Sequence, residues 1–228
     1  MRDYLDFKPV PDAPLDRLLL DFKFRRILPY IKRGAVLDVG CGIGRMTESI
    51  HNAGFYVTGV DGSLARISEA RVRVPSVEFI HSLFEDYKPK HLFATVVLSS
   101  VLEHVDEPVE LLKMCRGWLD GGGVLIAAVP NRNALHKLVG RAMGFTTPFT
   151  SNDVMVGHVN TYNLTELWVQ LLEAGFRIAA DGGVCVKPLP NAMLSAIPTE
   201  VLEGYFKASA NPKLKNLCSV VYAVGVKE

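Results

Sequence analysis

Short apolar runs alternate with amphipathic stretches along residues 35–130, and this alternation predicts the secondary structure of that part of the chain. Apolar and β-branched runs bounded by glycine or polar residues are typical of buried strands. Apolar residues spaced three and four apart are typical of helices that pack on one side. The expected strands cover residues 35–40, 55–61, 77–82, 92–100 and 121–130, and the expected helices cover residues 44–54, 63–74 and 107–119. Such strand–helix alternation favours a mostly parallel sheet covered by helices on both faces.

The flanking segments extend this pattern. A helix is expected over residues 14–31, with Pro14 in its first turn and Pro29 kinking or ending it. Beyond Pro130 we expect a helix over 131–145, a polar loop, a helix over 164–176, a strand over 177–186, a turn and helix over 188–208, and a strand over 217–226. Asn163 or Thr165 can cap the helix at 164–176, and Gly175 can end it. The pattern predicts one domain over residues 1–228, with a core at about 35–130 and insertions at about 131–162 and 183–210.

Composition narrows the class of protein. The 228 residues are 49% apolar and 21% charged, and the formal net charge is +1, so no strong positive field points to nucleic acid. The first residues contain three aspartates and no apolar core, unlike a secretory signal, and no apolar run approaches the roughly 18 residues that cross a bilayer. Four scattered cysteines form no C-x-x-C pair, which favours a reduced, cytoplasmic protein without disulfides or structural zinc.

Candidate chemistry begins with "AVLDVGCGIGR", where Gly40, Gly42 and Gly44 lie between an expected strand and an expected helix. A turn without Cβ atoms lets a ligand lie against the unpaired N–H groups of a helix start. Asp61 ends the next expected strand, where a carboxylate can accept hydrogen bonds from both hydroxyls of a ribose. A nucleoside derivative is therefore the expected ligand, and the alternative is a tight turn that binds nothing.

Glycine spacing separates the classes of nucleoside site. Dinucleotide sites use G-x-G-x-x-G, whereas this chain has G-x-G-x-G and no P-loop. The segment "VLDVGCGIG" resembles the first motif of class I S-adenosylmethionine (SAM) methyltransferases. The resemblance continues through "GVDGS", "LSSVLEHVDEP", "LLKMCRGWLDGGGVLIAAVP" and "GHVNTYNLTELWVQLLEAGF", and it is nearest to the ubiquinone-biosynthesis O-methyltransferases and their small-molecule relatives. It implies a Rossmann-like α/β fold, with a seven-stranded, mostly parallel sheet whose last strand is antiparallel and with helices on both faces.

The same resemblance implies a set of cofactor-binding residues. The three glycines would face the methionine part of SAM, and Asp61 the ribose. The remaining residues expected at the cofactor are Gly62, Ser63, Ser82, Leu83 and Phe84 around the adenine, Ser99 after the fourth strand, and Arg25, Arg26 or Arg45 as a cation for the carboxylate. Core packing is the alternative for Leu83 and Phe84, and surface solvation is the alternative for each arginine.

Two histidines are candidates for a general base that takes the proton of an oxygen acceptor. His104 follows the fourth expected strand, and His158 lies in the polar loop expected to form the acceptor wall, with a slight preference for His158. Glu103 is a candidate for orienting either ring, and Tyr162 for lining the acceptor pocket or for packing. Apart from the isolated Asp153, no acidic group of the kind that holds Mg²⁺ in catechol methyltransferases is found, so no metal is expected.

The sequence therefore predicts a SAM-dependent methyltransferase that releases S-adenosylhomocysteine (SAH). Its expected acceptor is an oxygen of a small molecule, such as a phenol, a sugar hydroxyl or an acidic metabolite. The alternatives are transfer to nitrogen or carbon, a non-enzymatic SAM-binding protein and an NAD-dependent oxidoreductase. The expected helix at residues 133–145 carries Lys137 and Arg141 at i,i+4 opposite apolar residues, so a lid, a peripheral membrane contact and a dimer contact all fit it. The segment 187–194 is a second candidate for closing the site, and the oligomeric state is left open.

Overall fold

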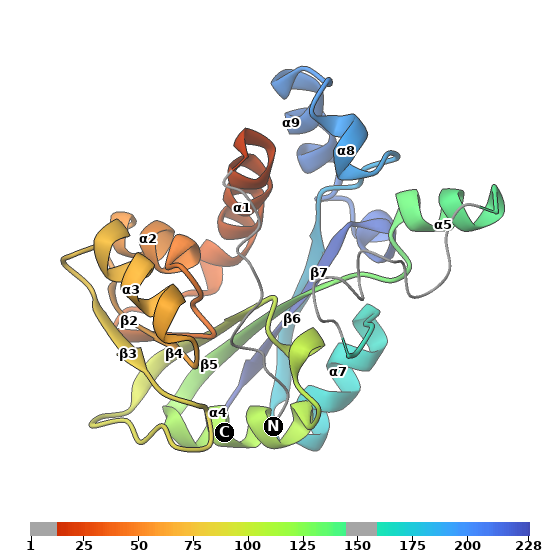
Figure 1. Cartoon of the computed structure of the whole chain (residues 1–228). Coiled ribbons are helices and arrows are strands. Elements are labelled where there is room, and N and C mark those ends of the chain that lie inside the picture. The colour runs from red at the N-terminus through yellow and green to blue at the C-terminus, as the bar shows by residue number, and fades with distance from the viewer. Residues whose placement is uncertain (1–12, 145–158) are drawn as a thin grey trace.

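The computed structural model describes residues 13–144 and 159–228. Within these residues, seven strands form one sheet in the order β3-β2-β1-β4-β5-β7-β6 (Figure 1). The strands are β1 (Ala35–Val39), β2 (Tyr56–Asp61), β3 (Glu78–His81), β4 (Phe93–Ser99), β5 (Leu119–Pro130), β6 (Arg177–Val184) and β7 (Val220–Val226).

Five neighbouring strands run parallel, and β7 runs antiparallel to both β5 and β6. The chain leaves β1 toward β2 and β3, then returns to place β4 on the other side of β1. The carboxyl ends of β1 and β4 therefore diverge at a topological switch point, where open α/β sheets bind their ligands. The expected Rossmann-like fold with an antiparallel last strand is confirmed.

Helices cover both faces of the sheet, as Figure 1 shows. One core lies between the sheet and the helices α1 (Pro14–Ile27), α2 (Arg45–Asn52), α3 (Leu64–Arg73) and α9 (Thr199–Ala208), and the other lies between the sheet and α4 (Pro108–Trp118) and α7 (Leu164–Glu173). Successive side chains of β1 alternate between them: Val36 is buried in the first core, and Leu37 and Val39 are buried in the second. This alternation explains why the strand pattern is nearly continuous in apolar residues.

Local signals set the ends of several helices where the sequence predicts them. The α-helix α1 stops at Ile27, and Leu28–Tyr30 form a 3₁₀ turn, because Pro29 has no N–H to continue the helix. Asn163 caps α7 in a capping box with Glu166. Gly175 follows α7 at φ 84°, a conformation that glycine adopts without strain.

The segment after β6 differs from the prediction. The strand ends at Val184 rather than at residue 186, and the next residue, Cys185, has φ 58°. The expected turn and helix at 188–208 form two helices, α8 (Asn191–Leu194) and α9. A 3₁₀ helix over Pro212–Leu217 then precedes β7, since its N-cap Asn211 and Pro212 favour a helical start over an extended chain.

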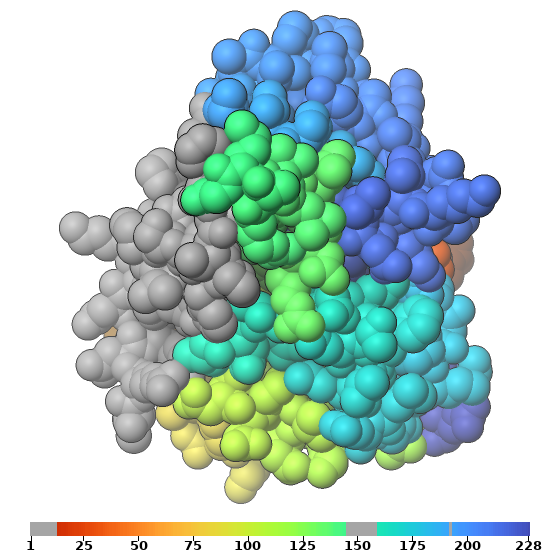
Figure 2. Space-filling view, turned by 90° about the vertical axis from the view of Figure 1, so that its right-hand side faces the viewer, coloured from red at the N-terminus to blue at the C-terminus, as the bar shows by residue number. Residues whose placement is uncertain are grey.

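Helix α5 (Leu135–Ala142) is shorter than the expected helix and lies next to α8 and the 3₁₀ helix before β7 (Figure 2). Its side chains Leu138 and Val139 are exposed, as is Met143 just beyond its end. Across the described ranges 13–144 and 159–228, no helix has the length and apolar character needed to span a bilayer.

Candidate functional site

The glycine turn follows β1 at the centre of the sheet. The N–H groups of Gly40 and Cys41 donate to the carbonyl oxygen of Val60 at 2.8 and 3.1 Å, which fastens the turn to β2. Gly44 is the N-cap of α2 at φ 80°. The backbone of the turn and the start of α2 therefore lie together at the carboxyl edge of the sheet, where N–H groups can face a ligand.

The glycines of this turn serve different purposes, although all three have positive φ. A Cβ on Gly40 would lie 2.6 Å from a methyl carbon of Val101, and one on Gly44 would lie 3.1 Å from Ala70. A Cβ on Gly42 would meet no atom within 4 Å. Gly40 and Gly44 thus permit close packing within the chain, whereas Gly42 borders open space in which a ligand can touch the main chain.

Asp61 lies beside this open space at the end of β2. Its carboxylate accepts hydrogen bonds from the N–H groups of Gly42 at 2.9 Å and Ser63 at 2.8 Å, one on each oxygen. An ionised carboxylate has about four acceptor positions, so two remain for a ligand. The arrangement fits the two hydroxyls of a ribose, and the hydrogen bonds to Gly42 and Ser63 fix the orientation of the carboxylate.

The segment after β3 approaches the same place. The N–H of Ser82 donates to the carbonyl oxygen of Asp61 at 3.1 Å. Leu83 is 42% exposed, and Phe84 packs partly against the second core. A large exposed apolar side chain beside a polar binding edge offers a surface for the faces of an adenine.

Gly62 and Ser63 connect this segment to α3. The carbonyl oxygen of Gly62 lies 3.0 Å from Nε2 of His81, and the Ser63 hydroxyl accepts from the N–H of Arg66 at 3.4 Å as the cap of α3. The structure therefore brings the residues expected around the ribose and adenine together at one end of β2 and β3.

One lysine that reaches this edge is Lys23 of α1, which the sequence analysis did not select. Its ammonium donates to the hydroxyl oxygens of Ser99 at 2.9 Å and Ser100 at 3.1 Å, at the carboxyl end of β4. Burial lowers the pKa of Lys23, and nearby Glu103 and Asp38 oppose that shift. A sequence signal existed: Leu15, Leu19, Lys23 and Ile27 follow one another at intervals of four, so this lysine lies in the apolar stripe of α1.

Arg25 lies on a different side of the same helix, since two residues advance an α-helix by about 200°. Its guanidinium pairs with Glu203 of α9 at 2.7 Å and with Asp21 at 3.2 Å. Arg25 is thus engaged between α1 and α9, whereas Lys23 contacts the end of β4.

The two other arginines also differ in position. Arg26 donates from Nη2 to the carbonyl oxygen of Phe206 at 2.7 Å and to the hydroxyl of Ser209 at 2.9 Å, again toward α9. Arg45 is the first residue of α2 and follows the glycine turn directly. Of the three arginines expected as cations for a carboxylate, Arg45 alone adjoins the turn in sequence.

The end of β4 has an unusual backbone. Ser100 has φ 61°, a left-handed conformation that is uncommon for residues other than glycine and that is concentrated at functional sites. Its N–H donates to the carbonyl oxygen of Ala128 at 2.8 Å, which holds the turn against β5. A 3₁₀ helix over Leu102–His104 follows, so His104 lies directly after the strand that carries Ser99.

The chain downstream of residue 158 returns to this position. The carbonyl oxygen of Glu103 accepts from the N–H groups of Val159 at 2.8 Å and Asn160 at 3.1 Å. His158 and Asp153 lie outside the described residues. In the ranges 13–144 and 159–228, no group of three or more metal-ligating side chains is found.

Buried ionisable groups are concentrated at the switch point. Asp38 of β1 is 1% exposed and accepts a hydrogen bond from the Thr47 hydroxyl at 2.6 Å. Burial raises the pKa of Asp38 to about 7, the Asp61 charge adds to the shift, and Thr47 and Lys23 oppose it. Burial also raises the pKa of Glu103. Such groups cost folding free energy and are typical of ligand-binding sites.

Tyr162 is 1% exposed, and its hydroxyl lies 3.1 Å from Oε1 of Gln170 and 3.3 Å from the carbonyl oxygen of Leu102. Burial raises its pKa to about 12. Tyr162 therefore joins α7 to the turn after β4 as a packed side chain.

Known proteins that are similar to this chain include methyltransferases. A family model described as a methyltransferase domain matches residues 14–180. The chain belongs to the methyltransferase domain family. This identification confirms the methyltransferase resemblance that the sequence indicates.

Individual relatives agree with the family. The chain is 33% identical over 134 residues to the ubiquinone biosynthesis O-methyltransferase of Aromatoleum aromaticum, with 56% of each chain covered. It is 29% identical over 169 residues to the enzyme of the same name from Coxiella burnetii, with 71% of each covered. The chain spans about half the length of the first of these relatives. A solved SAM-dependent methyltransferase from Thermotoga maritima shares the fold at 17% identity, with a TM-score of 0.66 over 94% of this chain and 91% of that one.

Proposed function

We propose that this chain transfers a methyl group from SAM to an oxygen of a small-molecule acceptor. The observation that carries the proposal is the open space at Gly42, next to the buried Asp61 carboxylate and at the edge that the Lys23 ammonium reaches. Bare main chain, a carboxylate and an ammonium complement a nucleoside that carries an amino acid. The relatives named ubiquinone biosynthesis O-methyltransferase support oxygen as the accepting atom.

In the proposed complex, Asp61 holds the ribose hydroxyls while Gly62, Ser63, Leu83 and Phe84 surround the adenine. Gly42 allows the methionine part to lie against the turn, between the packed Gly40 and Gly44. Ser99 and Arg45 border the same portion of the cofactor, and Arg25 is assigned to the contact with α9 instead.

Lys23 takes the role for which an arginine was expected. Its ammonium is half-buried and is held by two hydroxyls, and the turn carrying Ser100 positions those hydroxyls. A carboxylate placed beside it would replace weak neutral partners with a charge-assisted hydrogen bond.

Lys23→Met is expected to weaken SAH binding about 30-fold, because one charge-assisted hydrogen bond contributes ~2 kcal/mol. Isothermal titration of SAH measures the change. Lys113→Met, which removes an exposed lysine of α4, is the matched control and should bind SAH as the wild type does. Unchanged affinity in Lys23→Met would remove Lys23 from the site.

SAM supplies a methyl group already activated by its sulfonium, so the chain must align the acceptor and remove its proton. His104 follows β4 at the switch point, and Val159, the neighbour of His158, is hydrogen-bonded to the same turn. Both histidines therefore remain candidates for the base.

Either His104→Gln or His158→Gln removes the proposed base. The variant that removes it is expected to have a kcat about 100-fold lower than that of the wild type. Turnover measured from pH 5.5 to 9 should also lose its dependence on a group that titrates near neutrality in that variant. Near-wild-type turnover of both variants across this range excludes base catalysis by these histidines.

Labelled SAM incubated with pooled phenols, sugars and acidic metabolites tests the activity as a whole. We expect label in an ether, which resists acid and base, together with SAH. Titration with SAM, SAH and NAD runs in parallel. Binding of NAD without SAM would overturn the proposal, and label on nitrogen or carbon would correct the accepting atom.

A further inference from the structure

A second lysine is buried at the other half of the same edge. Lys187 follows β6 and is 5% exposed. Its ammonium donates a hydrogen bond to the side-chain oxygen of Asn191 at the start of α8. That partner is a neutral amide, and no carboxylate forms an ion pair with Lys187 in the described part of the chain. Burying an ammonium without a counter-charge is costly, so the position is unfavourable unless an anion joins it.

The charges around Lys187 come from three elements. Lys137 of α5 adds a second positive charge, and Asp16 of α1 adds a weaker opposing negative one. Cys185, the residue after β6, is a titratable group on the same segment as Lys187. Burial raises the pKa of the Cys185 thiol to about 11, so this thiol is neutral near pH 7. Of the charges of Lys137 and Asp16, the positive one therefore has the larger effect on Lys187.

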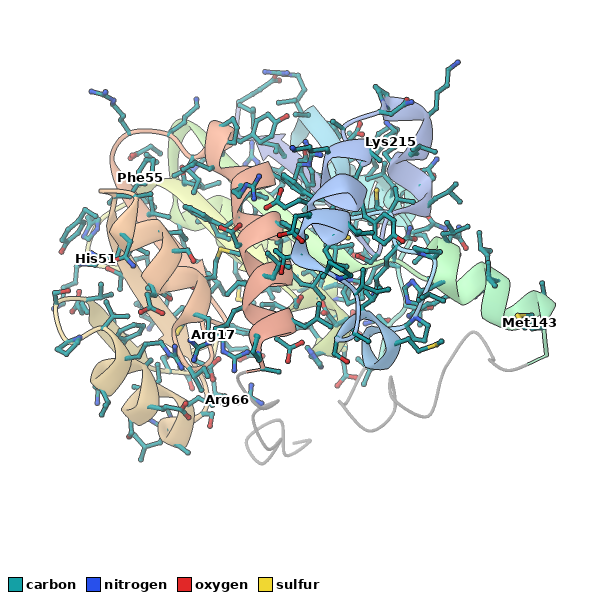
Figure 3. All side chains as sticks on the ribbon, turned by 90° about the horizontal axis from the view of Figure 1, so that it is seen from above. Arg17, His51, Phe55, Arg66, Met143 and Lys215 are labelled. Atoms are coloured by element: carbon teal, nitrogen blue, oxygen red, sulfur yellow. The ribbon has the colours of Figure 1, made fainter. Side chains whose placement is uncertain are left out.

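Lys187 and Lys137 lie at a different part of this edge from the proposed cofactor site. Asp61 and the glycine turn lie at the ends of β1 and β2, whereas Lys187 follows β6 and Lys137 lies on α5, which follows β5. In Figure 3, Arg66 of α3 lies on one side of the molecule, and Met143, just beyond the end of α5, lies on the other. Figure 2 shows α5 beside the α8–α9 segment, which follows Lys187 in the chain, and the charge of Lys137 acts on Lys187.

We infer that Lys187, supported by Lys137, binds a carboxylate or phosphate group of the methyl acceptor. This inference rests on the proposed function, since it assigns the second half of the edge to the acceptor. It narrows the acceptors to those with an oxyanion group, because an anion there would compensate the buried charge of Lys187.

Three ring compounds test this inference at pH 7.0, with and without saturating SAH: benzoate, phenyl phosphate and the neutral benzamide. We expect the wild type to bind at least one anion about tenfold more tightly than benzamide, the gain of one charge-assisted hydrogen bond. Lys187→Met should bind the anions no better than benzamide. The two anions distinguish a carboxylate site from a phosphate site.

Lys207→Met, which removes an exposed lysine of α9, is the control and should keep the preference for the anion. Thermal unfolding of Lys187→Met checks its folding, and we expect a midpoint no lower than that of the wild type, because a costly buried charge is removed. A wild type without preference for either anion, or Lys187→Met that keeps it, overturns the inference. The same titrations also measure SAH binding. A wild type that does not bind SAH would contradict the proposed function, whereas a missing anion preference contradicts only this inference.

The preference should also depend on pH. Burial lowers the pKa of Lys187 to about 8, while Lys137 adds to the shift and Cys185 and Asp16 oppose it. Asn191 does not titrate. Anion binding should therefore be strong below pH 8 and fall as Lys187 loses its proton above that value. An anion preference that is flat from pH 7 to 9.5 would assign the binding to another cation.

Discussion

Replacing Asp61 with alanine is expected to weaken SAH binding about 100-fold, a loss of ~2.8 kcal/mol. The substitution removes the only carboxylate that the structure places against Gly42 and the end of β2, within the described residues. It also leaves the N–H groups of Gly42 and Ser63 without their acceptor, so the turn loses its fixed shape. Titration calorimetry with SAH measures the effect directly.

Two further variants make this test specific. Asp61→Asn keeps an acceptor for one N–H group and should lose less affinity than Asp61→Ala. Asp120→Ala removes an exposed carboxylate at the amino end of β5 and should bind SAH normally. Wild-type affinity in Asp61→Ala would mean that the ribose is not held at the end of β2.

Alanine at Gly40 is expected to destabilise the fold by ~3 kcal/mol, whereas alanine at Gly42 is expected to cost ~1 kcal/mol. A Cβ at Gly40 would lie 2.6 Å from a methyl carbon of the buried Val101, whose branched side chain has little freedom to move. A Cβ at Gly42 meets only open space, so its cost is that of the left-handed backbone. Urea unfolding measures both free energies.

The affinity for SAH should rank these two variants in the opposite order, with the larger loss in Gly42→Ala. Gly42→Ala places a methyl group in the space proposed for the cofactor and should lower SAH affinity about 30-fold, or ~2 kcal/mol. Gly40→Ala combined with Val101→Ala should be less destabilised than the sum of the two single changes, because the clashing methyl groups are gone. Full SAH affinity in folded Gly42→Ala would show that the ligand does not contact this turn.

Both parts of the edge that are proposed to bind ligands carry buried charges that lower the stability of the fold. Lys23, Asp38 and Glu103 are drawn together at the switch point, and Lys187 is buried without a counter-ion among the described residues. Apolar residues of similar volume would serve the core better at each position. The concentration of such groups at one edge of the sheet is the physical reason to seek the ligands there.

The amino-acid sequence determined the secondary-structure elements and the residues proposed for the cofactor side of the site. Hydrophobic patterns predicted the strands and helices of residues 35–130. Local rules ended α1 shortly before Pro29 and capped α7 at Asn163, since such effects depend on neighbouring residues alone. Motif order then brought Gly42, Asp61 and Leu83 to one edge, because a parallel sheet aligns the carboxyl ends of its strands.

Tertiary structure decided which charges face that edge. Lys23 and Arg25 are two residues apart in one helix, and only the packing of α1 against β4 and α9 directs the first to Ser99 and the second to Glu203. The left-handed turn at Ser100 and the burial of Lys187 between α1, α5 and α8 likewise depend on contacts between residues far apart in sequence. Composition specifies how many charges a chain carries, but the burial that alters their chemistry arises only when distant segments meet.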